Sequence, residues 1–580
     1  MFYMAESGKT ASPDTHTHAE PLRFGIMCNG WVLQAWQIKA IRLLEEKGCR
    51  PELLIFNDNQ DKPPAGWKKL IHYPYNKLFY RLYLRFAHHP ASKKPINIKD
   101  FFNTTEAVHC RPDRIGHSEV FRETDVIQIK EIKLDFILRF GFNIIRGEIL
   151  TAARYGVWSF HHGDEQHYRG GPPGFWEIYH GNPVTGAMLQ RLTDRLDAGV
   201  VLRKGHFRTV HHCWSGSIDQ LFMETAHWPA QVATDIMNDV SLSWNQQPVR
   251  TEAPVFKVPG NAQMMRFVLS LMISRVRFHF DRLFRAEKWN IGIIRAPVKD
   301  ILTGHTRIQP EWLLPIQPHR YAADPFAITA PDRLRIFYES YDYHAARGTI
   351  ASIQVDLNSG RVSPPSTVLE KDYHLAYPYI FAVDGKWHCI PETALNRTVD
   401  LYCWDEDAGR LVFDRTLLYD VDAVDSTVFQ HDQYWWLFCT RKSLSDTHLY
   451  AYYSREFTGP YQPHHNNPIK TDVRSARPAG PLLILDGLLL RPAQDCSVRY
   501  GYRITMQKII RLTPDEFVET SAGWIGPFKG TSFPMGAHTL IDAGDHTVID
   551  AKRYVFDGWN FVHELNRSVQ GRIPPKPNNH

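Results

Sequence analysis

The stretch from residue 156 to residue 202 holds side chains that could carry out acid–base or metal chemistry. Residues 156–168 read Gly-Val-Trp-Ser-Phe-His-His-Gly-Asp-Glu-Gln-His-Tyr, and Asp197 follows 36 positions after His161. Imidazole is the side chain whose ordinary pKa lies closest to neutral pH, so a histidine here can exchange a proton with a reacting group. A metal ion is the alternative, because four residues at short spacing are ordinary ligands: His161, His162, Asp164 and His167. We predict no metal site, because no cysteine pair or helical His-x-x-x-His accompanies them.

The elements before this stretch predict a parallel α/β sheet. Residues 22–28 form a short apolar run, residues 36–44 have helical spacing, and residues 53–56 form a second apolar run. Residues 134–141 predict another buried strand, and a helix-like segment over 149–155 then leads to the strand that carries His161. The first turn lacks Gly-x-Gly-x-x-Gly, so a dinucleotide is not implied.

These motifs resemble the core of the folate-dependent formyltransferases. That family has a strand ending in Asn-x-His, an Arg-Gly turn, a Thr-Gly strand and a Leu-Asp-x-Gly loop, and this chain matches all of them except that Ser159 replaces the Asn. The resemblance covers about residues 21–245 and implies a Rossmann-like α/β domain. It also implies roles for seven residues: His161, Asp197 and Ser159 in catalysis, and Arg169, Gly170, Thr185 and Gly186 in cofactor binding. The implied cofactor is 10-formyltetrahydrofolate as formyl donor.

The second half of the chain predicts an all-β five-bladed propeller. Apolar segments with a hairpin turn begin at residues 332, 384, 432, 486 and 545. Five repeats of this length are typical of a propeller, and Trp289–Ile293 is expected to supply a strand that closes the last blade. The inner strands of a propeller face one central cavity. We therefore expect these side chains to converge there: Asp324, His374, Asp425, Arg477 and His538, with Glu339, Glu392 and Asp495 nearby.

Residues 290–570 resemble two groups of carbohydrate proteins. The Asp324 and Asp425 segments are similar to those of arabinanase-type glycoside hydrolases, in which carboxylates flank the scissile bond. Residues 374–379, 423–427 and 472–480 resemble the propeller attached to glucosamine inositolphosphorylceramide transferases. We expect the catalytic domain of those transferases to be absent from this chain, which ends at residue 580.

Length and composition indicate a multidomain globular protein. The 580 residues divide into an expected disordered start (1–20), a formyltransferase-like domain (21–250), a linker with an amphipathic helix (251–288), the propeller (289–570) and a flexible end (571–580). The net charge of +5 carries no nucleic-acid signature, and no apolar run reaches the length of a transmembrane segment. The helix over residues 264–284 is interpreted as a packing helix between domains or as a helix lying in a membrane interface. The polar first residues indicate a cytoplasmic protein.

The main functional hypothesis is formyl transfer from 10-formyltetrahydrofolate to an amine, with an amino sugar or glycan held by the propeller. The alternative is a carbohydrate-binding or glycoside-hydrolase-like propeller with a degenerate transferase domain. For the propeller itself, recognition of a glycan without cleavage is favoured over hydrolysis. The sequence does not determine the acceptor or the oligomeric state.

Overall fold

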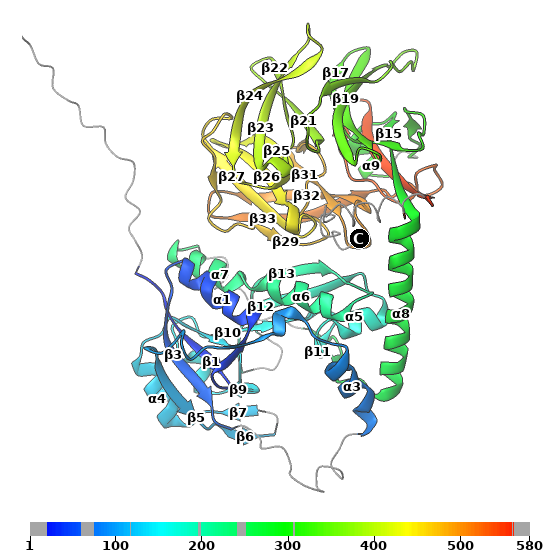
Figure 1. The fold of residues 1–580 in the computed structure, drawn as a ribbon. Helices are drawn as coiled ribbons and strands as arrows, with labels where there is room; N and C mark the ends of the chain where they lie inside the picture. Colours follow the sequence, from blue (N-terminus) through cyan, green and yellow to red (C-terminus); the bar gives the residue numbers. More distant parts are fainter. Residues whose placement is uncertain are drawn as a thin grey trace, which may run out of the picture.

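The computed structural model describes residues 20–59, 75–116, 118–194, 199–240, 251–304, 308–558 and 561. The segments expected to be a disordered start and a flexible end, and the expected partner Asp197, lie outside these residues, except for Glu20. Strands dominate, and the chain forms an α/β part followed by an all-β part (Figure 1).

The α/β part is built on one seven-stranded mixed sheet. Its order is β13 (Val200–Arg208), β12 (Val184–Arg191), β10 (Val157–His161), β8 (Phe136–Arg139), β1 (Arg23–Cys28), β3 (Arg50–Asn57) and β5 (Glu106–Cys110). The strands from β10 to β5 pair in parallel, and β12 and β13 are antiparallel. The predicted strands at residues 22–28, 53–56 and 134–141 are therefore confirmed within a few residues.

Alternate residues of these strands enter two separate cores. Phe24, Leu54 and Phe136 belong to one apolar cluster, whereas their neighbours Leu53 and Ile137 belong to the other. Successive side chains of a strand point to opposite faces, so both faces of the sheet are covered. The helices of this part are α1 (Ala35–Glu46), α3 (Leu78–Phe86), α4 (Glu123–Glu131), α5 (Phe175–His180), α6 (Trp214–Thr225) and α7 (Trp228–Met237).

Short elements connect these layers. They are β2 (Val32–Gln34), β4 (Pro95–Asn97), β6 (Asp113–Ile115), β7 (Ser118–Val120), β9 (Ile144–Arg146), β11 (Arg169–Gly170) and β14 (Val255–Phe256). The helix expected over 149–155 is instead a 3₁₀ turn, Glu148–Thr151.

Within the described residues, the all-β part has five sheets. The first is β17 (Arg320–Ala330), β18 (Arg333–Asp342), β19 (Arg347–Asp356) and β20 (Ser366–Leu369). The second is β21 (Ala376–Val383), β22 (Lys386–Glu392), β23 (Thr398–Asp405) and β24 (Arg410–Tyr419). The third is β25 (Ala423–His431), β26 (Tyr434–Arg441), β27 (His448–Ser454) and β28 (Gln462–Pro463), with β29 (Lys470–Thr471) beside β27. The fourth is β30 (Leu483–Leu485), β31 (Leu488–Asp495), β32 (Arg503–Leu512) and β33 (Phe517–Ile525).

The fifth sheet joins both ends of the all-β part. It has the order β16 (Glu311–Trp312), β15 (Arg285–Ile294), β35 (Thr547–Phe556) and β34 (Leu540–Asp542). The expected closing strand at Trp289–Ile293 is thus confirmed, because β15 pairs with β35 along its whole length. Apolar clusters link the fourth sheet to the third and to the fifth, and β17 contacts both β15 and β21. The sheets therefore follow one another around a ring, as in a propeller.

The α/β part and the ring are in direct contact. Strand β13 lies beside β29, and α7 donates hydrogen bonds from Gln231 Nε2 to the carbonyl oxygens of Asn466 and Pro468, both at 2.8 Å. Helix α8 (Asn261–Phe284) runs along the side of the α/β part and leads directly into β15 (Figure 1). A cavity of about 350 Å³ lies between the two parts, lined among others by Lys204, Trp228 and Lys470.

Candidate functional site

One backbone feature recurs in three consecutive sheets. The inner strands β17, β21 and β25 each carry a β-bulge, and the residues at the bulge have a left-handed backbone: Asp324 (φ 52°), Tyr377 (φ 42°) and Asp425 (φ 54°). A bulge redirects a side chain, and a left-handed tyrosine is unusual enough to point to a functional or packing requirement. The three positions are equivalent, so their side chains converge from three sheets.

The second strands place further polar residues opposite these bulges. Glu339 pairs with Ala323, Glu392 with Ala376, and Thr440 with Val424, so all three occupy the same step of their hairpins. Glu339 is 4% exposed, and its Oε1 has no hydrogen-bond partner among the described residues. A buried carboxyl oxygen without a donor is rare and requires an explanation.

The segment that precedes β30 contributes a cation to this cluster. Arg477 donates from Nε to Oδ2 of Asp425 at 2.5 Å, and Gln494 Nε2 donates to the same oxygen at 3.1 Å. The guanidinium also lies over the ring of Tyr500, 4.7 Å from its centroid. Arg477 and Asp425 are both buried, so the pair neutralises two charges that water does not solvate.

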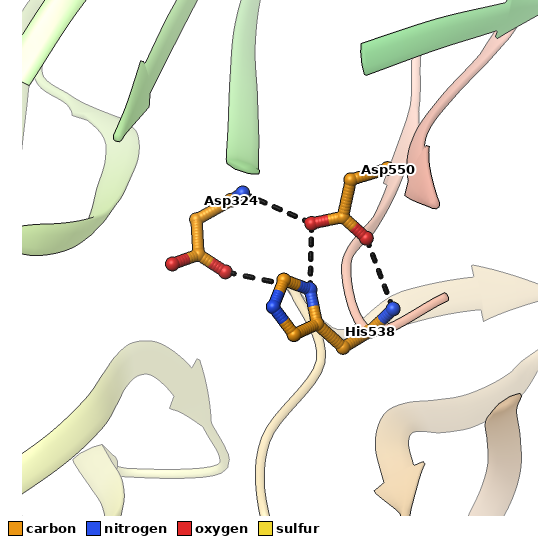
Figure 2. A group of neighbouring side chains, drawn as sticks. All are labelled: Asp324, His538 and Asp550. Atoms are coloured by element: carbon orange, nitrogen blue, oxygen red, sulfur yellow. Dashed lines mark hydrogen bonds and ion pairs between the residues drawn. The ribbon is translucent and has the colours of Figure 1, made fainter. Parts of the chain in front are cut away.

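The fifth sheet completes the ring with His538 and Asp550 (Figure 2). His538 Nδ1 lies 2.6 Å from Oδ2 of Asp550 and 3.6 Å from Oδ1 of Asp324. The backbone amides of Asp324, His538 and Thr539 all donate to Asp550. Asp550 therefore joins the first blade to the last by hydrogen bonds.

The same three side chains have the spacing of a metal-binding group. Ligand atoms of Asp324, His538 and Asp550 lie within 4.8 Å of one another. In this structure those atoms bind one another and the backbone, as described above. Across the described ranges, His161, His162, Asp164 and His167 do not form such a group.

Burial and mutual repulsion raise the pKa values of these carboxyls. Burial raises the pKa of Asp324 to about 6, against the opposing effect of His538, and it raises the pKa of Glu392 to about 8, with Asp425 adding to the effect. Burial and the neighbouring Asp324 hold the pKa of Glu339 well above its ordinary value. At neutral pH, Glu392 is therefore a proton donor beside the charged pair of Asp425 and Arg477.

Solvent reaches the edge of this cluster. Its half-buried members are His374, Glu392, Lys442 and Tyr500. His374 accepts a hydrogen bond at Nδ1 from the Gly348 amide at 2.9 Å, and its Nε2 lies 3.8 Å from Glu339. Burial lowers the pKa of His374 to about 4, so this ring is neutral at physiological pH.

The structure brings together the propeller residues expected from the sequence. Asp324, Asp425, Arg477 and Glu392 belong to one cluster, and His374 lies at its edge, three positions before the equivalent bulge residue Tyr377. Sequence reasoning missed Tyr377 and Asp550. Tyr377 could have been found by aligning the three bulged segments, whereas no local pattern marks Asp550.

In the α/β part, Ser159 is held by another side chain. Arg139 donates from Nη1 to Ser159 Oγ at 2.8 Å, and Ser159 is 3% exposed. His161 ends the same strand two residues later. Because Asp197 lies outside the described residues, the structure does not test the predicted pairing of His161 with this aspartate.

The residues expected to bind a cofactor are engaged in packing. Arg169 and Gly170 pair with Val255 and Phe256 as β11 and β14, and Arg169 Nη1 donates to the Ala253 carbonyl at 3.2 Å. Thr185 is fully buried and its hydroxyl lies 2.8 Å from that of Thr209. Gly186 backs onto Asp164, where a Cβ would approach the Asp164 Cβ to 2.8 Å.

A network of charges surrounds Asp164. Lys204 Nζ lies 3.1 Å from Asp164 Oδ1 and 2.9 Å from Glu165 Oε1, and His206 bridges Asp164 to Asp472 of the ring. Burial opposes ionisation of Asp164, but the hydrogen bond from His206 and the charge of Lys204 hold its pKa well below the ordinary range. These contacts attach the segment around His161 to the propeller.

Comparison with known proteins shows what the ring is similar to. Residues 314–536 match the family described as glucosamine inositolphosphorylceramide transferase 1, N-terminal. The chain is 32% identical over 261 residues to glucosamine inositolphosphorylceramide transferase 1 of Oryza sativa subsp. japonica, covering 44% of this chain and 34% of that protein. It is 29% identical over 208 residues to the transferase of the same name from Arabidopsis thaliana, covering 35% of this chain and 27% of that protein. The chain thus spans about a third of the curated relatives it matches.

Two solved structures show remote likeness. A family 117 glycoside hydrolase from Zobellia galactanivorans has a TM-score of 0.31 and 13% identity, covering 48% of this chain and 91% of that chain. Glycinamide ribonucleotide transformylase 1 from Symbiobacterium toebii has a TM-score of 0.28 and 14% identity, covering 42% of this chain and all of that chain (100%). At these TM-scores neither likeness carries an argument about this protein.

The comparisons correct the main functional hypothesis. The matching family and the curated relatives given above carry the name glucosamine inositolphosphorylceramide transferase 1, not that of a folate-dependent formyltransferase. The predictions of formyl transfer, of a formyltransferase enzyme class and of 10-formyltetrahydrofolate as cofactor are therefore wrong. The error came from short motifs around His161, which fix a local arrangement of residues but not the reaction. Residues 314–536 are a propeller region similar to the N-terminal region of the sugar transferases.

Proposed function

We propose that the ring binds a sugar-containing ligand at the cluster formed by Asp425, Arg477, Glu392 and His374. The observation that carries this proposal is the convergence of a buried Asp425–Arg477 pair with half-buried Glu392 and His374. Carbohydrates are recognised by carboxylates, guanidinium groups and aromatic rings, because each sugar hydroxyl both donates and accepts hydrogen bonds. The match to relatives named for glucosamine and inositolphosphorylceramide supports a sugar as the ligand.

The side chains at this site offer both kinds of hydrogen-bonding partner. Asp425 can accept hydrogen bonds from hydroxyl or amino groups, and the neutral imidazole of His374, whose Nδ1 already accepts from the Gly348 amide, can donate one from Nε2. Glu392, whose pKa is raised to about 8, donates a hydrogen bond at neutral pH, and Lys442 adds a positive charge nearby. Glucosamine, through its amino group, and inositol phosphate, through its anion, are therefore the first ligands to test.

Binding is best measured by calorimetric titration of the full chain with glucosamine and, separately, with inositol phosphate. Asp425→Asn should weaken binding at least about tenfold, since a hydrogen bond to a charged group contributes roughly 1.5–3 kcal/mol. Glu392→Leu should weaken it about two- to tenfold, since it removes a neutral donor worth roughly 0.5–1.5 kcal/mol. Asp432→Asn is the matched control, because Asp432 is 76% exposed on the β25–β26 hairpin. Equal affinities in all three variants, or no binding to the folded wild-type chain, would refute the proposal.

Cleavage of a glycosidic bond is a second candidate function. It is favoured by the combination of a protonated Glu392 and a charged Asp425 at one site, because glycoside hydrolysis requires one carboxylic acid and one carboxylate. Release of a chromogenic aglycone from nitrophenyl glycosides tests this candidate. Turnover that disappears in Glu392→Gln but persists in Asp432→Asn would support cleavage, and binding without turnover leaves recognition as the function.

A further inference from the structure

Helix α8 has two apolar faces, only one of which is packed. Met264, Phe267 and Leu271 are buried, and Phe267 stacks on Phe175 of α5 with ring centroids 4.2 Å apart. This face anchors the helix to the α/β part. The interpretation of α8 as a packing helix accounts for this face alone.

The opposite face of α8 is an exposed apolar stripe. It contains Met265, Leu269, Met272, Ile273, Val276 and Phe280, which are 46–71% exposed. Their spacing of three or four residues places them on one side of the helix over nearly its whole length. Single exposed apolar residues are ordinary, but a continuous stripe of this length marks a surface that binds something.

Helix α3 lies beside α8 (Figure 1). It also has exposed apolar side chains. Phe79, Leu82 and Phe86 follow one another at helical spacing and are 41%, 42% and 71% exposed. The two helices begin together, because Asn261 Oδ1 accepts from the Phe79 amide at 3.1 Å. The exposed apolar side chains of α3 and α8 are called the helix-pair surface below.

The charged side chains of α3 and α8 are mostly positive. Helix α3 contains two arginines and α8 contains four, against the single acidic residue Asp281. At about 100° per residue, Arg266 and Arg277 border the α8 stripe on one side, whereas Arg275 and Arg282 lie near the angle of the packed residue Met264. Asp281 is engaged by Arg277 at 3.8 Å and by Arg285 at 3.1 Å.

We propose that the helix-pair surface docks the protein on an anionic lipid bilayer, with the apolar stripe of α8 at the boundary of headgroups and acyl chains. A helix with an exposed apolar face bordered by arginines is typical of interfacial binding, in which the arginines reach the phosphates of the lipids. A second copy of the same surface would bring arginines against arginines, so charge favours lipid over self-association. No helix within the described residues is long and apolar enough to cross a membrane, and this mode of binding needs none.

Flotation of the full chain with vesicles tests the proposal. The bound fraction should be high on phosphatidylcholine vesicles containing phosphatidylserine, low on phosphatidylcholine alone, and should fall as salt is raised. The double variant Leu269→Glu/Val276→Glu should reduce binding to the anionic vesicles at least about tenfold, because it places two carboxylates at the acyl boundary. Ile484→Glu is the control, since Ile484 is 77% exposed on the ring and should float like the wild type.

Thermal unfolding of each variant shows whether it is folded, and light scattering gives its mass. Loss of flotation in the folded double variant with flotation retained in Ile484→Glu supports docking. Absence of wild-type binding at low salt, or equal binding of the double variant, overturns the proposal. A wild-type dimer that the double variant dissociates, with no vesicle binding, also overturns it and makes the surface an interface between copies.

Discussion

Arg208 on β13 donates from Nη2 to Oδ2 of Asp446 at 2.8 Å, and this bond joins residues 238 positions apart in the two parts of the chain. Asp446 also lies 3.5 Å from Nη1 of Arg477, which pairs with Asp425. An alternating series of charges therefore runs from the α/β sheet to the centre of the ring. Asp446 and Arg477 thus connect the contact between the two parts to the candidate sugar site.

Replacing Arg208 should measurably lower the free energy of unfolding. Arg208→Met leaves Asp446 with one cation fewer in a buried place, and a lost hydrogen bond between charged groups costs about 1.5–3 kcal/mol of unfolding free energy. Urea titration monitored by tryptophan fluorescence measures this change. Arg295→Met is the control, because Arg295 and Glu311 are both more than half exposed and such a pair contributes about 0–1 kcal/mol. Equal losses of unfolding free energy in the two variants would contradict a stabilising buried bond between Arg208 and Asp446.

Removal of Arg477 should lower the free energy of unfolding more than removal of an exposed arginine in the same ring. Arg477→Met leaves Asp425 buried without its cation, which costs about 3–5 kcal/mol when the remaining charge is not solvated. Arg415→Met is matched to it, since Arg415 is 51% exposed and lies 3.3 Å from Asp414. The difference in urea midpoint between the two variants is the quantity to measure. A shift no larger than that of Arg415→Met would mean that water enters the site and solvates Asp425.

Stability should decrease as pH rises from about 6.5 to above 8. Burial raises the pKa of Glu224 to about 8, so the folded state retains a proton that the unfolded state releases above its ordinary pKa of 4.5. The stabilisation is therefore complete below 4.5 and is lost as the pH approaches 8. His206 acts in the same direction, because, although burial opposes it, Asp164 and Asp472 raise its pKa above 6.5.

Thermal melts at a series of pH values test this dependence. Glu224→Gln should flatten the alkaline decrease, because glutamine keeps the contact with Thr447 without titrating. His448 has the opposite sign: burial lowers its pKa to about 4, so its contribution is complete above 6.5 and is lost as pH falls towards 4. An alkaline slope unchanged by Glu224→Gln would assign the effect to His206 or to other groups.

Gly170 should not tolerate a side chain. A Cβ there would lie 2.2 Å from the Phe256 carbonyl oxygen, and the backbone is left-handed (φ 83°). Gly170→Ala combines this clash with backbone strain and should cost more than about 1–3 kcal/mol. Gly385→Ala separates the two effects, because Gly385 has φ 75° with nothing within 4 Å of a Cβ. Equal losses of unfolding free energy in the two variants would contradict the prediction and would mean that β14 moves away and relieves the clash.

Local pattern determined the elements of this protein. Apolar alternation around Asp-Gly turns located the hairpins at Asp384 and Asp486, which the structure confirms, and both aspartates have a left-handed backbone there. The same reasoning located β1, β3, β8 and the closing strand β15, because strand period and turn chemistry are encoded in neighbouring residues. It also named Asp324, Asp425, Arg477 and Glu392, since residues at one step of a repeated hairpin must meet at the centre of a ring.

Only the tertiary structure decided how these residues are paired. Asp550 accepts from the Asp324 amide across 226 residues, and Thr447 donates to Glu224 across 223, and neither contact has a local signature. The motifs around His161 suggested a reaction that the relatives do not support, because a motif specifies residue types and not their partners. The sequence by itself thus determined strands, turns and the identity of the charged residues. Which charges are buried, neutralised or left at the edge for a ligand followed from packing distant segments together, since burial and electrostatic pairing are properties of the assembled fold.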